Sequence, residues 1–482
     1  MSYGQAHSMD VESGLRALRT GRFEEAQRSF ARLSQEAPDS PEGPFFQAFE
    51  MWWKLLDRSR EQPGVRLQME ERLEEAARRA QKLQSSPSAE DQQRGFIYLG
   101  VARLLDAQSK AVRGSHLGAA GSARQGHRAL TEALRRNPEE ADALFAMGAY
   151  NYFADNMPAV VKGIRLLLFI PGGDGERGIA QLEQAAASSR LFGTEALLLL
   201  AHIFSQGDDE DFARALGYVE QASAREPSSP VITLVQADLL FNAGRLGEAS
   251  ERSRGVLQAL QGEHGYREDL RRYAAYRAAS CRLKLHDPRG ALAMVEAEMD
   301  TSPPRTAQDR RRWMTLLAAA ARDAGHPERV ETWLERVSLT KDEQETIRRR
   351  LRGASQDKVA AERALALELA TGGHREEALR RLEGLLQSIA PSDPRIQYDL
   401  GRLLQAQGKF DEARPHLTAA AGAAPPDLAG WAWIRLGWDL EREARRDEAV
   451  AFYERAAKLK NFTFQPAARL RRDHPGTEPP EG

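Results

Sequence analysis

Apolar residues recur at every third or fourth position along much of the chain, with charged residues between them. Residues 400–425 show the pattern clearly, with Leu400 and Leu417 on the apolar stripes and Gly408 between the two stretches. This spacing is the period of an α-helix that buries one face. The segment therefore predicts two amphipathic helices joined by a turn, and Pro425 is expected to end the second helix.

The same arrangement recurs elsewhere. Gly401 is followed by Ala413, and the pair recurs 36 residues later as Gly437 and Ala449. Small residues at these positions allow the two helices of a hairpin to approach closely, so they are expected to pack at the helix seams. The complete set of small residues with this expected role is Gly14, Ala26, Gly100, Gly126, Gly148, Gly178, Ala215, Ala249, Ala291, Ala378, Gly401, Ala413, Gly437 and Ala449.

This pattern resembles the tetratricopeptide repeat, in which a small residue is followed by an alanine twelve positions on and an aromatic residue four later. Ala26 with Phe30 and Ala449 with Tyr453 match the second part of that pattern. The resemblance implies an all-α fold, a right-handed superhelical solenoid of about ten or eleven helix hairpins. No segment of the chain has the pattern of a strand ladder.

Two hairpins depart from the usual spacing. Gly126 lies 26 residues after Gly100, and Gly178 lies 30 residues after Gly148, where the repeat has twelve. We therefore expect lengthened helices in both hairpins. Residues 41–85 predict a further helix pair that lacks the repeat pattern.

The expected organisation has five parts. Residues 1–10 are expected to be a flexible N-terminus, and residues 465–482, rich in Pro, Gly and charge, a disordered tail. Between them we expect three blocks of repeats, covering residues 11–190, 191–340 and 341–464.

Charge and composition narrow the possible functions. With 68 basic and 70 acidic residues the net charge is -2, which disfavours nucleic-acid binding because phosphate neutralisation requires an excess of Lys and Arg. Only ten of the basic residues are Lys, a bias that favours a GC-rich, bacterial source. The N-terminus has no basic and apolar leader, so the expected location is the cytoplasm, or the periplasm if an export signal was removed.

Residues 95–190 have a narrower resemblance. The segments YLGVARLL and LFAMGAYNYFADNMPAVVKGIRLLLFIPGGDGERGI are similar to bacterial tetratricopeptide proteins related to the eukaryotic inclusion-body-clearance and outer-membrane family. That resemblance implies a non-enzymatic role in handling proteins or lipids near a membrane. The apolar residues within 157–172 are interpreted as packing against neighbouring hairpins, and contact with a membrane surface is the alternative.

Patterns typical of catalysis or metal binding are missing. The ten histidines include no pair at the spacing of a helical zinc site, and the single cysteine, Cys281, is expected to be buried packing. Gly172, Gly173 and Gly175 do not form a phosphate-binding loop, and Asp174 is expected to cap the next helix. The sequence therefore predicts a protein that is not an enzyme and needs neither cofactor nor metal.

A binding role remains, because stacked hairpins present the side chains of their first helices on a concave surface. Trp438 is expected to be either an exposed anchor for a partner, since interfaces favour Trp and Arg, or a buried residue that caps the end of the stack. The chain lacks the Lys and Asn clamp with which some relatives hold acidic chaperone tails. The residues expected to contact a partner are His202, Asp238, Phe241, Asn242, Arg402, Gln405, Trp438 and Arg442.

The sequence thus predicts a scaffold or adaptor that binds a partner protein or peptide in the groove of its solenoid. A membrane-peripheral factor acting through residues 157–172 is the alternative, and a noncatalytic subunit of a larger complex is a further one.

Overall fold

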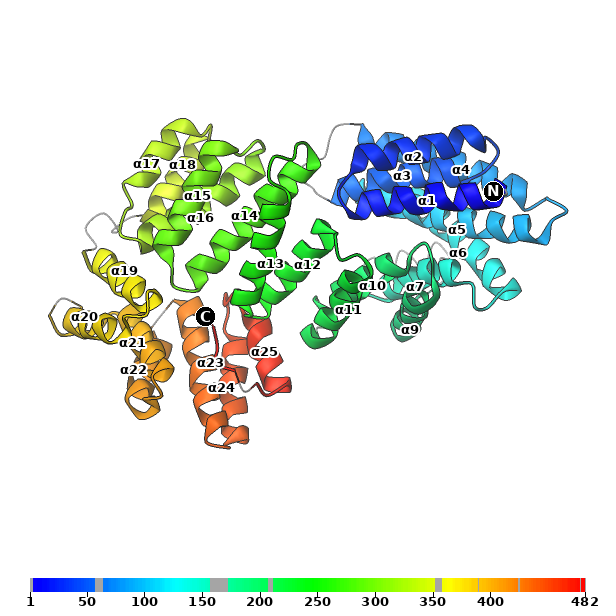
Figure 1. Cartoon of the computed structure of the whole chain (residues 1–482). Coiled ribbons are helices and arrows are strands. Elements are labelled where there is room, and N and C mark those ends of the chain that lie inside the picture. The colour runs from blue at the N-terminus through cyan, green and yellow to red at the C-terminus, as the bar shows by residue number, and fades with distance from the viewer. Residues whose placement is uncertain are drawn as a thin grey trace. The chain divides into compact units, whose positions relative to one another are not determined.

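The computed structural model describes residues 3–56, 64–156, 172–206, 211–351, 358–388, 390–423, 425–476 and 478–481. Within these ranges the chain forms 24 helices and no strand (Figure 1). The prediction of an all-α fold built from stacked helix hairpins is confirmed. The number of hairpins stays a prediction.

The described residues divide into two compact units, described here one at a time. Unit 1 comprises residues 1–210 and 217–232, and unit 2 comprises residues 211–216 and 233–482. The division does not coincide with the expected block boundaries at 190 and 340. Helices α11 (Phe212–Arg225) and α12 (Pro230–Asn242) have residues in both units.

Unit 1 is a succession of antiparallel helices. The pair α3 and α4 is the hairpin that residues 41–85 predict without the repeat pattern. Besides part of α11 and α12, the helices are α1 (Tyr3–Arg19), α2 (Phe23–Glu36), α3 (Glu42–Leu56), α4 (Val65–Leu83), α5 (Ala89–Val112), α6 (His116–Arg136), α7 (Ala141–Asp155), α9 (Gly175–Ser188) and α10 (Gly193–Phe204).

Unit 2 continues in the same manner. Its remaining helices are α13 (Leu246–Ala259), α14 (Tyr266–Lys284), α15 (Pro288–Thr301), α16 (Ala307–Asp323), α17 (Arg329–Arg336), α18 (Lys341–Leu351), α19 (Lys358–Thr371), α20 (Arg375–Ser388), α21 (Pro394–Ala406), α22 (Phe410–Ala423), α23 (Pro426–Arg442), α24 (Arg446–Lys458) and α25 (Gln465–Asp473).

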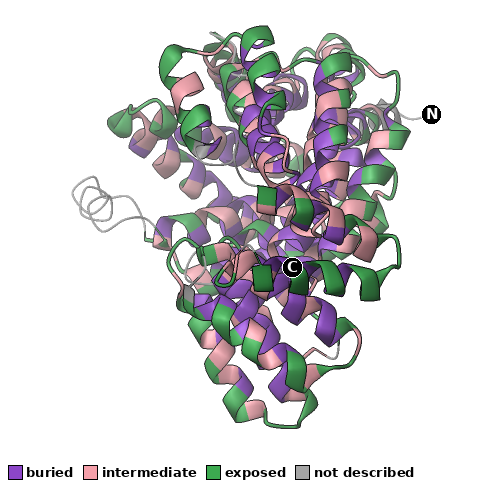
Figure 2. Ribbon diagram, turned by 90° about the vertical axis from the view of Figure 1, so that its left-hand side faces the viewer, coloured by how far each residue is buried: buried purple, intermediate pink, exposed green. Residues whose placement is uncertain are grey.

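The seams between paired helices are closed by glycine against a bulky neighbour. A Cβ atom added at Gly401 would lie 2.6 Å from the Cγ of Leu417, and one at Gly14 would lie 2.3 Å from the ring of Phe30. Buried positions run along the sides of the helices that face their neighbours (Figure 2). Because any larger residue would have to push these helices apart, glycine fixes the distance between the axes.

Glycine also makes the turns inside the hairpins. Gly21, Gly244 and Gly408 all have φ near 75–79°, the left-handed conformation that residues with a Cβ adopt at a cost. The corresponding turn between α23 and α24 has Ala444 at φ 59°. Repetition of one turn geometry gives the hairpins their common form.

The lengthened hairpins differ from each other. Helices α5 and α6 have 24 and 21 residues, so the added length in this hairpin is helical, as predicted. Helices α7 and α9 have only 15 and 14 residues. The insertion between them lies at residues 157–171, outside the described residues, so the prediction of longer helices in this second hairpin is wrong for the part that is described.

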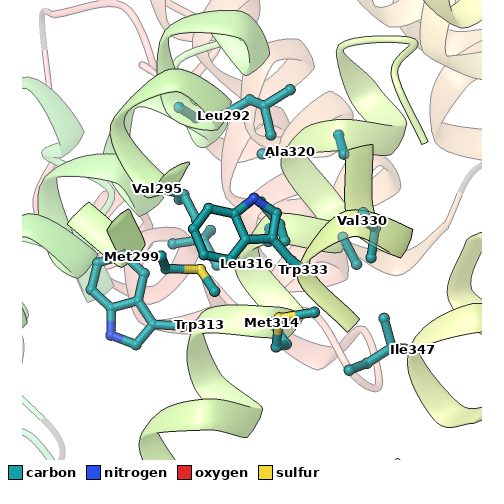
Figure 3. Packing of buried hydrophobic residues seen from close by; sticks show 14 of the residues in the cluster. Leu292, Val295, Met299, Trp313, Met314, Leu316, Ala320, Val330, Trp333 and Ile347 are labelled. Carbon is teal, nitrogen blue, oxygen red and sulfur yellow. The ribbon is translucent and has the colours of Figure 1, made fainter. Parts of the chain in front are cut away.

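The core of unit 2 includes a cluster of buried residues from α15, α16, α17 and α18 (Figure 3). Trp313 and Trp333 pack there beside Met314, and each exposes 5% of its surface or less. Two indole rings bury a large apolar area, which compensates for the shortness of α17, an eight-residue helix.

Both ends of the chain depart from expectation. Residues 3–10, expected to be flexible, lie in α1, and residues 465–473, expected to be disordered, form α25. The Pro, Gly and charged residues of the tail outnumber its few apolar residues. Phe464, just before the tail, and Ala467 and Ala468 within it are nevertheless buried and close the end of the last hairpin. A terminal helix of this kind covers apolar surface that a stack of hairpins would otherwise leave open.

Candidate functional site

The first helices of the later hairpins in unit 2 bring charged side chains together. Arg363 projects from α19, Arg402 from α21 and Arg435 from α23, and we refer to these three as the arginine cluster. Asp399 of α21 and His286, in the turn between α14 and α15, lie beside it. The last hairpin of unit 2 packs back on its earlier helices, as the 2.8 Å ion pair between Lys284 Nζ and Asp427 Oδ2 shows.

Asp399 is the centre of this group. Its side chain is completely buried, and its Oδ2 accepts a hydrogen bond of 2.5 Å from Arg363 Nε. Its Oδ1 lies 3.6 Å from Arg402 Nη2 and 3.6 Å from His286 Nδ1. One carboxylate therefore faces several cationic or titratable groups at once.

Arg435 is held by a different set of partners. Its Nε donates to the Tyr398 hydroxyl at 2.9 Å, and its Nη1 donates to Gln405 Oε1 at 3.3 Å. The Gln405 side chain in turn donates to the Arg435 carbonyl oxygen at 3.2 Å. These contacts fix the guanidinium group in one orientation and leave Nη2 directed at a further acceptor.

Burial and neighbouring charges shift the pKa values of the residues in this group. Burial together with the nearby Arg402, Arg363 and Arg435 lowers the pKa of His286 well below its ordinary value. Burial also lowers the pKa of Arg402. The neighbouring acids Asp323 and Asp393 make hydrogen bonds with Arg322 and Arg395. Asp323 also acts electrostatically on Arg363, together with Asp399.

Arg19, a buried arginine of unit 1, differs from the arginine cluster in its partners. Arg19 contacts two carboxylates, with Nη2 2.7 Å from Glu195 Oε2 and Nη1 3.0 Å from Glu226 Oε1. Its charge is compensated within the fold. That group therefore has a structural role.

The final residues of the chain contact the cluster. The carbonyl oxygen of Pro480, a buried residue, accepts a hydrogen bond of 2.7 Å from Arg435 Nη2. The carboxylate of Glu481 accepts one of 2.6 Å from the backbone N–H of Gly247, in the first turn of α13. Arg471 Nη2 donates to the carbonyl oxygen of Glu478 at 2.9 Å. Burial raises the pKa of Glu481, and the backbone hydrogen bonds partly oppose that rise.

The structure brings together some of the residues that the sequence proposes as partner contacts. Arg402 and Gln405 belong to the arginine cluster or its immediate contacts. Asp238 and Phe241 serve internal packing instead: Asp238 accepts from the Tyr273 hydroxyl at 2.6 Å, and the Phe241 ring centroid lies 5.3 Å from that of Phe464, with the two rings tilted.

The remaining predicted contacts are dispersed. His202 is exposed on α10 of unit 1, Asn242 is half-buried at the end of α12, and Arg442 is exposed with its guanidinium carbon 3.5 Å from the Phe410 ring centroid. Trp438 is buried at 7% exposure beside the same ring, so its assignment as an exposed anchor is wrong. Trp438 lies one position after Gly437 on the packed side of α23, and an indole there fills the space between helices.

Sequence reasoning missed Asp399 and Arg435. A signal was present, because each lies two positions before a seam glycine, Gly401 and Gly437, in an otherwise apolar stretch. A charged residue at the same position of two successive repeats, with opposite sign in each, indicates a polar contact between repeats.

The described residues form neither a metal site nor a reactive cysteine. No group of three or more His, Cys, Asp or Glu side chains there is arranged to hold a metal ion. Cys281 is buried, and burial raises the pKa of its thiol to about 12, so it is not a nucleophile at neutral pH. Asp174 accepts a hydrogen bond from the backbone N–H of Arg177 and caps α9, as predicted.

The membrane alternative concerns residues 157–172, of which all but Gly172 lie outside the described residues. Among the helices in the described ranges, none combines the length and the apolar character that crossing a bilayer requires.

Successive antiparallel hairpins with glycine and alanine seams define a helical-repeat protein. Comparison with known families gives the kind of repeat: residues 112–156 and 205–251 match one profile of the tetratricopeptide repeat, and residues 370–436 match another. The chain therefore contains tetratricopeptide repeats in these three stretches.

The similarity to individual proteins is either short in length or low in sequence identity. A peroxisomal targeting signal receptor from Candida glabrata is 38% identical over 81 residues, which cover 17% of this chain and 13% of the receptor. Among solved structures, a tetratricopeptide repeat protein from Parabacteroides merdae is 13% identical, with a TM-score of 0.25 over 58% of this chain and 97% of that one. Human IFIT1 with PPP-AAAA is 16% identical, with a TM-score of 0.32 over 86% of this chain and 93% of that one. Scores this low carry no argument about function.

Proposed function

We propose that this protein is a non-catalytic scaffold that binds a segment of a partner protein where Arg435 and the first turn of α13 hold residues 480 and 481. Tetratricopeptide repeats indicate a protein-interaction scaffold, and such proteins are typically not enzymes. The observation that carries the finer proposal is that Pro480 and Glu481 of the chain itself bind there.

The contacts suit a peptide. Arg435 donates to a backbone carbonyl, a group that every peptide has, and Gly247 donates a backbone N–H to a carboxylate. A helix N-terminus stabilises a negative charge through its free N–H groups and its dipole. The curated relative is named as a receptor for a targeting signal, which agrees with recognition of a protein segment.

Site-specific photo-crosslinking in cells tests the proposal. A benzophenone amino acid is introduced at Glu248, an exposed position next to Gly247, and in a matched variant at Arg380, an exposed position on α20 of the same unit. We expect a defined partner band from the Glu248 variant and none from the Arg380 variant. Equal labelling at both positions, or no crosslink at Glu248, would contradict the proposal.

A further inference from the structure

Arginine and aromatic side chains form a continuous row across the first helices of three successive hairpins in unit 2. We call it the arginine–aromatic row, and its members are Phe241 of α12, Tyr273, Tyr276 and Arg277 of α14, and Arg312 of α16. The Arg277 guanidinium carbon lies 4.3 Å from the Phe241 ring centroid, and the two tyrosine rings stack with centroids 6.3 Å apart. The Arg312 guanidinium carbon lies 5.5 Å and 5.4 Å from the centroids of the same two tyrosine rings. Ring contacts therefore link each of these helices to the next.

Asp238 of α12 satisfies the polar groups at one end of the row. The Tyr273 hydroxyl donates to Asp238 Oδ2 at 2.6 Å, and Arg277 Nε donates to Asp238 Oδ1 at 2.8 Å. Arg277 Nη2 also donates to the Tyr273 hydroxyl at 3.1 Å. Because these three side chains bind one another, this end of the row has a structural role.

The other end of the row has polar groups without such partners. Within the described part of the chain, the Arg312 guanidinium group contacts the two tyrosine rings and makes no hydrogen bond or ion pair. The Tyr276 hydroxyl likewise has no hydrogen-bond partner among the described residues. Both side chains are half-buried, so part of each still reaches the surface. A guanidinium group and a hydroxyl group are therefore both free to donate to a ligand at the same place.

The carboxylates near Arg312 on these helices each lie against a different arginine. The pairs are Glu268 with Arg305, Asp309 with Arg272, and Glu343 with Arg311. None of these three carboxylates forms an ion pair with Arg312. The charge of Arg312 is thus available to an acceptor on another molecule.

Ring contacts hold the two free groups in place before any ligand binds. Arg312 is positioned over two aromatic rings, and the Tyr276 ring packs edge-to-face on Trp313 with centroids 5.7 Å apart. Trp313 is itself buried at 3% exposure in the core of unit 2. A guanidinium group stacked on aromatic rings keeps the N–H groups along its edge free to donate. Little side-chain freedom is left to lose when a ligand binds.

We propose that Arg312 and Tyr276 form a docking site for an aspartate or glutamate side chain of a partner polypeptide. The edge of a guanidinium group donates two parallel hydrogen bonds to a carboxylate, and the Tyr276 hydroxyl supplies a further donor. The tyrosine rings offer apolar surface to the residues beside that carboxylate, and Tyr and Arg are typical anchors of protein interfaces. This site is separate from the one at Arg435 and Gly247, so it goes beyond the proposed function.

The charge of the site favours a carboxylate over a phosphorylated side chain. A phosphate group carries nearly two negative charges at neutral pH, and proteins recognise it with clusters of arginines. Arg312 is one free guanidinium group, which matches the single charge of a carboxylate.

The test uses a phage-displayed library of random short peptides, selected on the full-length chain and counter-selected on the Arg312→Gln variant. We expect the enriched peptides to share an Asp or Glu residue. One such peptide, labelled with fluorescein, is then measured by fluorescence polarisation. It should bind Arg312→Gln at least about tenfold more weakly than the parent chain, because a hydrogen-bonded charge is lost. Tyr276→Phe should weaken binding by about three- to tenfold through loss of one neutral hydrogen bond.

Three further measurements define the role of the guanidinium group. Arg380→Gln removes an exposed arginine of α20 in the same unit and should change the affinity by less than about twofold. Arg312→Lys keeps the charge without the planar fork and should give an intermediate loss. Replacing the shared acidic residue of the peptide with its amide should weaken binding to the parent chain but not to Arg312→Gln.

Thermal unfolding should place all four variants close to the parent chain, and Tyr276→Phe, which keeps the ring, provides the test on its own if Arg312→Gln unfolds. No peptide that distinguishes the parent from Arg312→Gln, or discriminating peptides without a shared acid, would overturn the inference. The Glu248 crosslink tests the other surface, so the two proposals can fail separately.

Discussion

Arg363 and Asp399 form a buried ion pair in unit 2, with Nε of the arginine 2.5 Å from Oδ2 of the aspartate and side-chain exposures of 8% and 0%. The pair joins α19 to α21, the first helices of two successive hairpins. Asp399 also lies within 4 Å of Arg402 and His286. Its carboxylate thus lies close to Arg363, Arg402 and His286 in the interior of the unit.

Replacing Asp399 with Asn should strongly destabilise unit 2. The substitution keeps the shape of the side chain but leaves the guanidinium groups of Arg363 and Arg402 without their counter-charge, and breaking a buried pair in this way costs about 3–5 kcal/mol. Urea unfolding followed by circular dichroism measures the loss.

The matched control for Asp399 is an exposed pair of the same unit. Arg445 Nε and Nη2 each lie 2.7 Å from a Glu448 carboxylate oxygen, with both side chains about half exposed. Glu448→Gln should leave the free energy of unfolding nearly unchanged, because water screens an exposed ion pair. Similar losses in the two variants would mean that burial does not determine the importance of Asp399.

The seam glycines give a second prediction with its control on the neighbouring helix. In Gly401→Ala the new Cβ would lie 2.6 Å from Leu417 Cγ, so the helices must separate and stability should fall by about 1–3 kcal/mol. In Gly384→Ala on α20 the new Cβ has nothing within 4 Å, and the better helix propensity of Ala should raise stability by about 0.5–1 kcal/mol. Opposite shifts of the urea midpoint are expected, and a stabilised Gly401→Ala variant would contradict the role of the seam.

The seam is also the feature that the sequence predicts best. A small residue and an alanine twelve positions later identify paired helices without any knowledge of long-range contacts, because the constraint acts within one hairpin. Gly14 with Ala26 and Gly401 with Ala413 show this directly. The arginine cluster could not be found in this way, since its contacts run between hairpins and not within one.

The helix at residues 465–473 was not predicted from the sequence, for a related reason. Its Pro, Gly and charged residues are typical of disorder. Helix α25 is nevertheless ordered by burial of a few small and aromatic residues, and Glu481 is held by a helix N-terminus more than 230 residues away in the sequence. Composition describes the average of a segment, whereas docking here depends on individual residues.

Trp438 provides a third prediction. It is buried, with its ring 5.7 Å from that of Phe410 in an edge-to-face arrangement. Trp438→Ala should therefore lower stability by about 3–5 kcal/mol through the cavity that it leaves. Trp438→Phe keeps most of the apolar volume and should lose much less. Thermal unfolding of the two variants decides the matter, and a Trp438→Ala variant as stable as the parent chain would show that the side chain is not part of the core.

A fourth prediction concerns pH and the half-buried Asp142 at the start of α7 in unit 1. Burial raises the pKa of its carboxyl group from 3.8 to about 6, although Ser189 Oγ donates a hydrogen bond of 2.6 Å to it. A raised pKa means that the folded state holds the proton more tightly than the unfolded state. The resulting stability is fully present below about pH 4 and is lost as the pH rises through about 6.

Asp142→Asn should remove this dependence, because the amide oxygen can still accept from Ser189 and carries no charge. The variant should be close to the parent chain near pH 4 and more stable than it at pH 8, by on the order of 1–3 kcal/mol. Thermal unfolding from pH 4 to 8 measures the difference. Ser189→Ala is the informative partner variant: without the hydrogen bond that stabilises the charged form, the parent's loss of stability should move to higher pH. An Asp142→Asn variant whose stability changes with pH as the parent's does would show that the proton on Asp142 is not responsible.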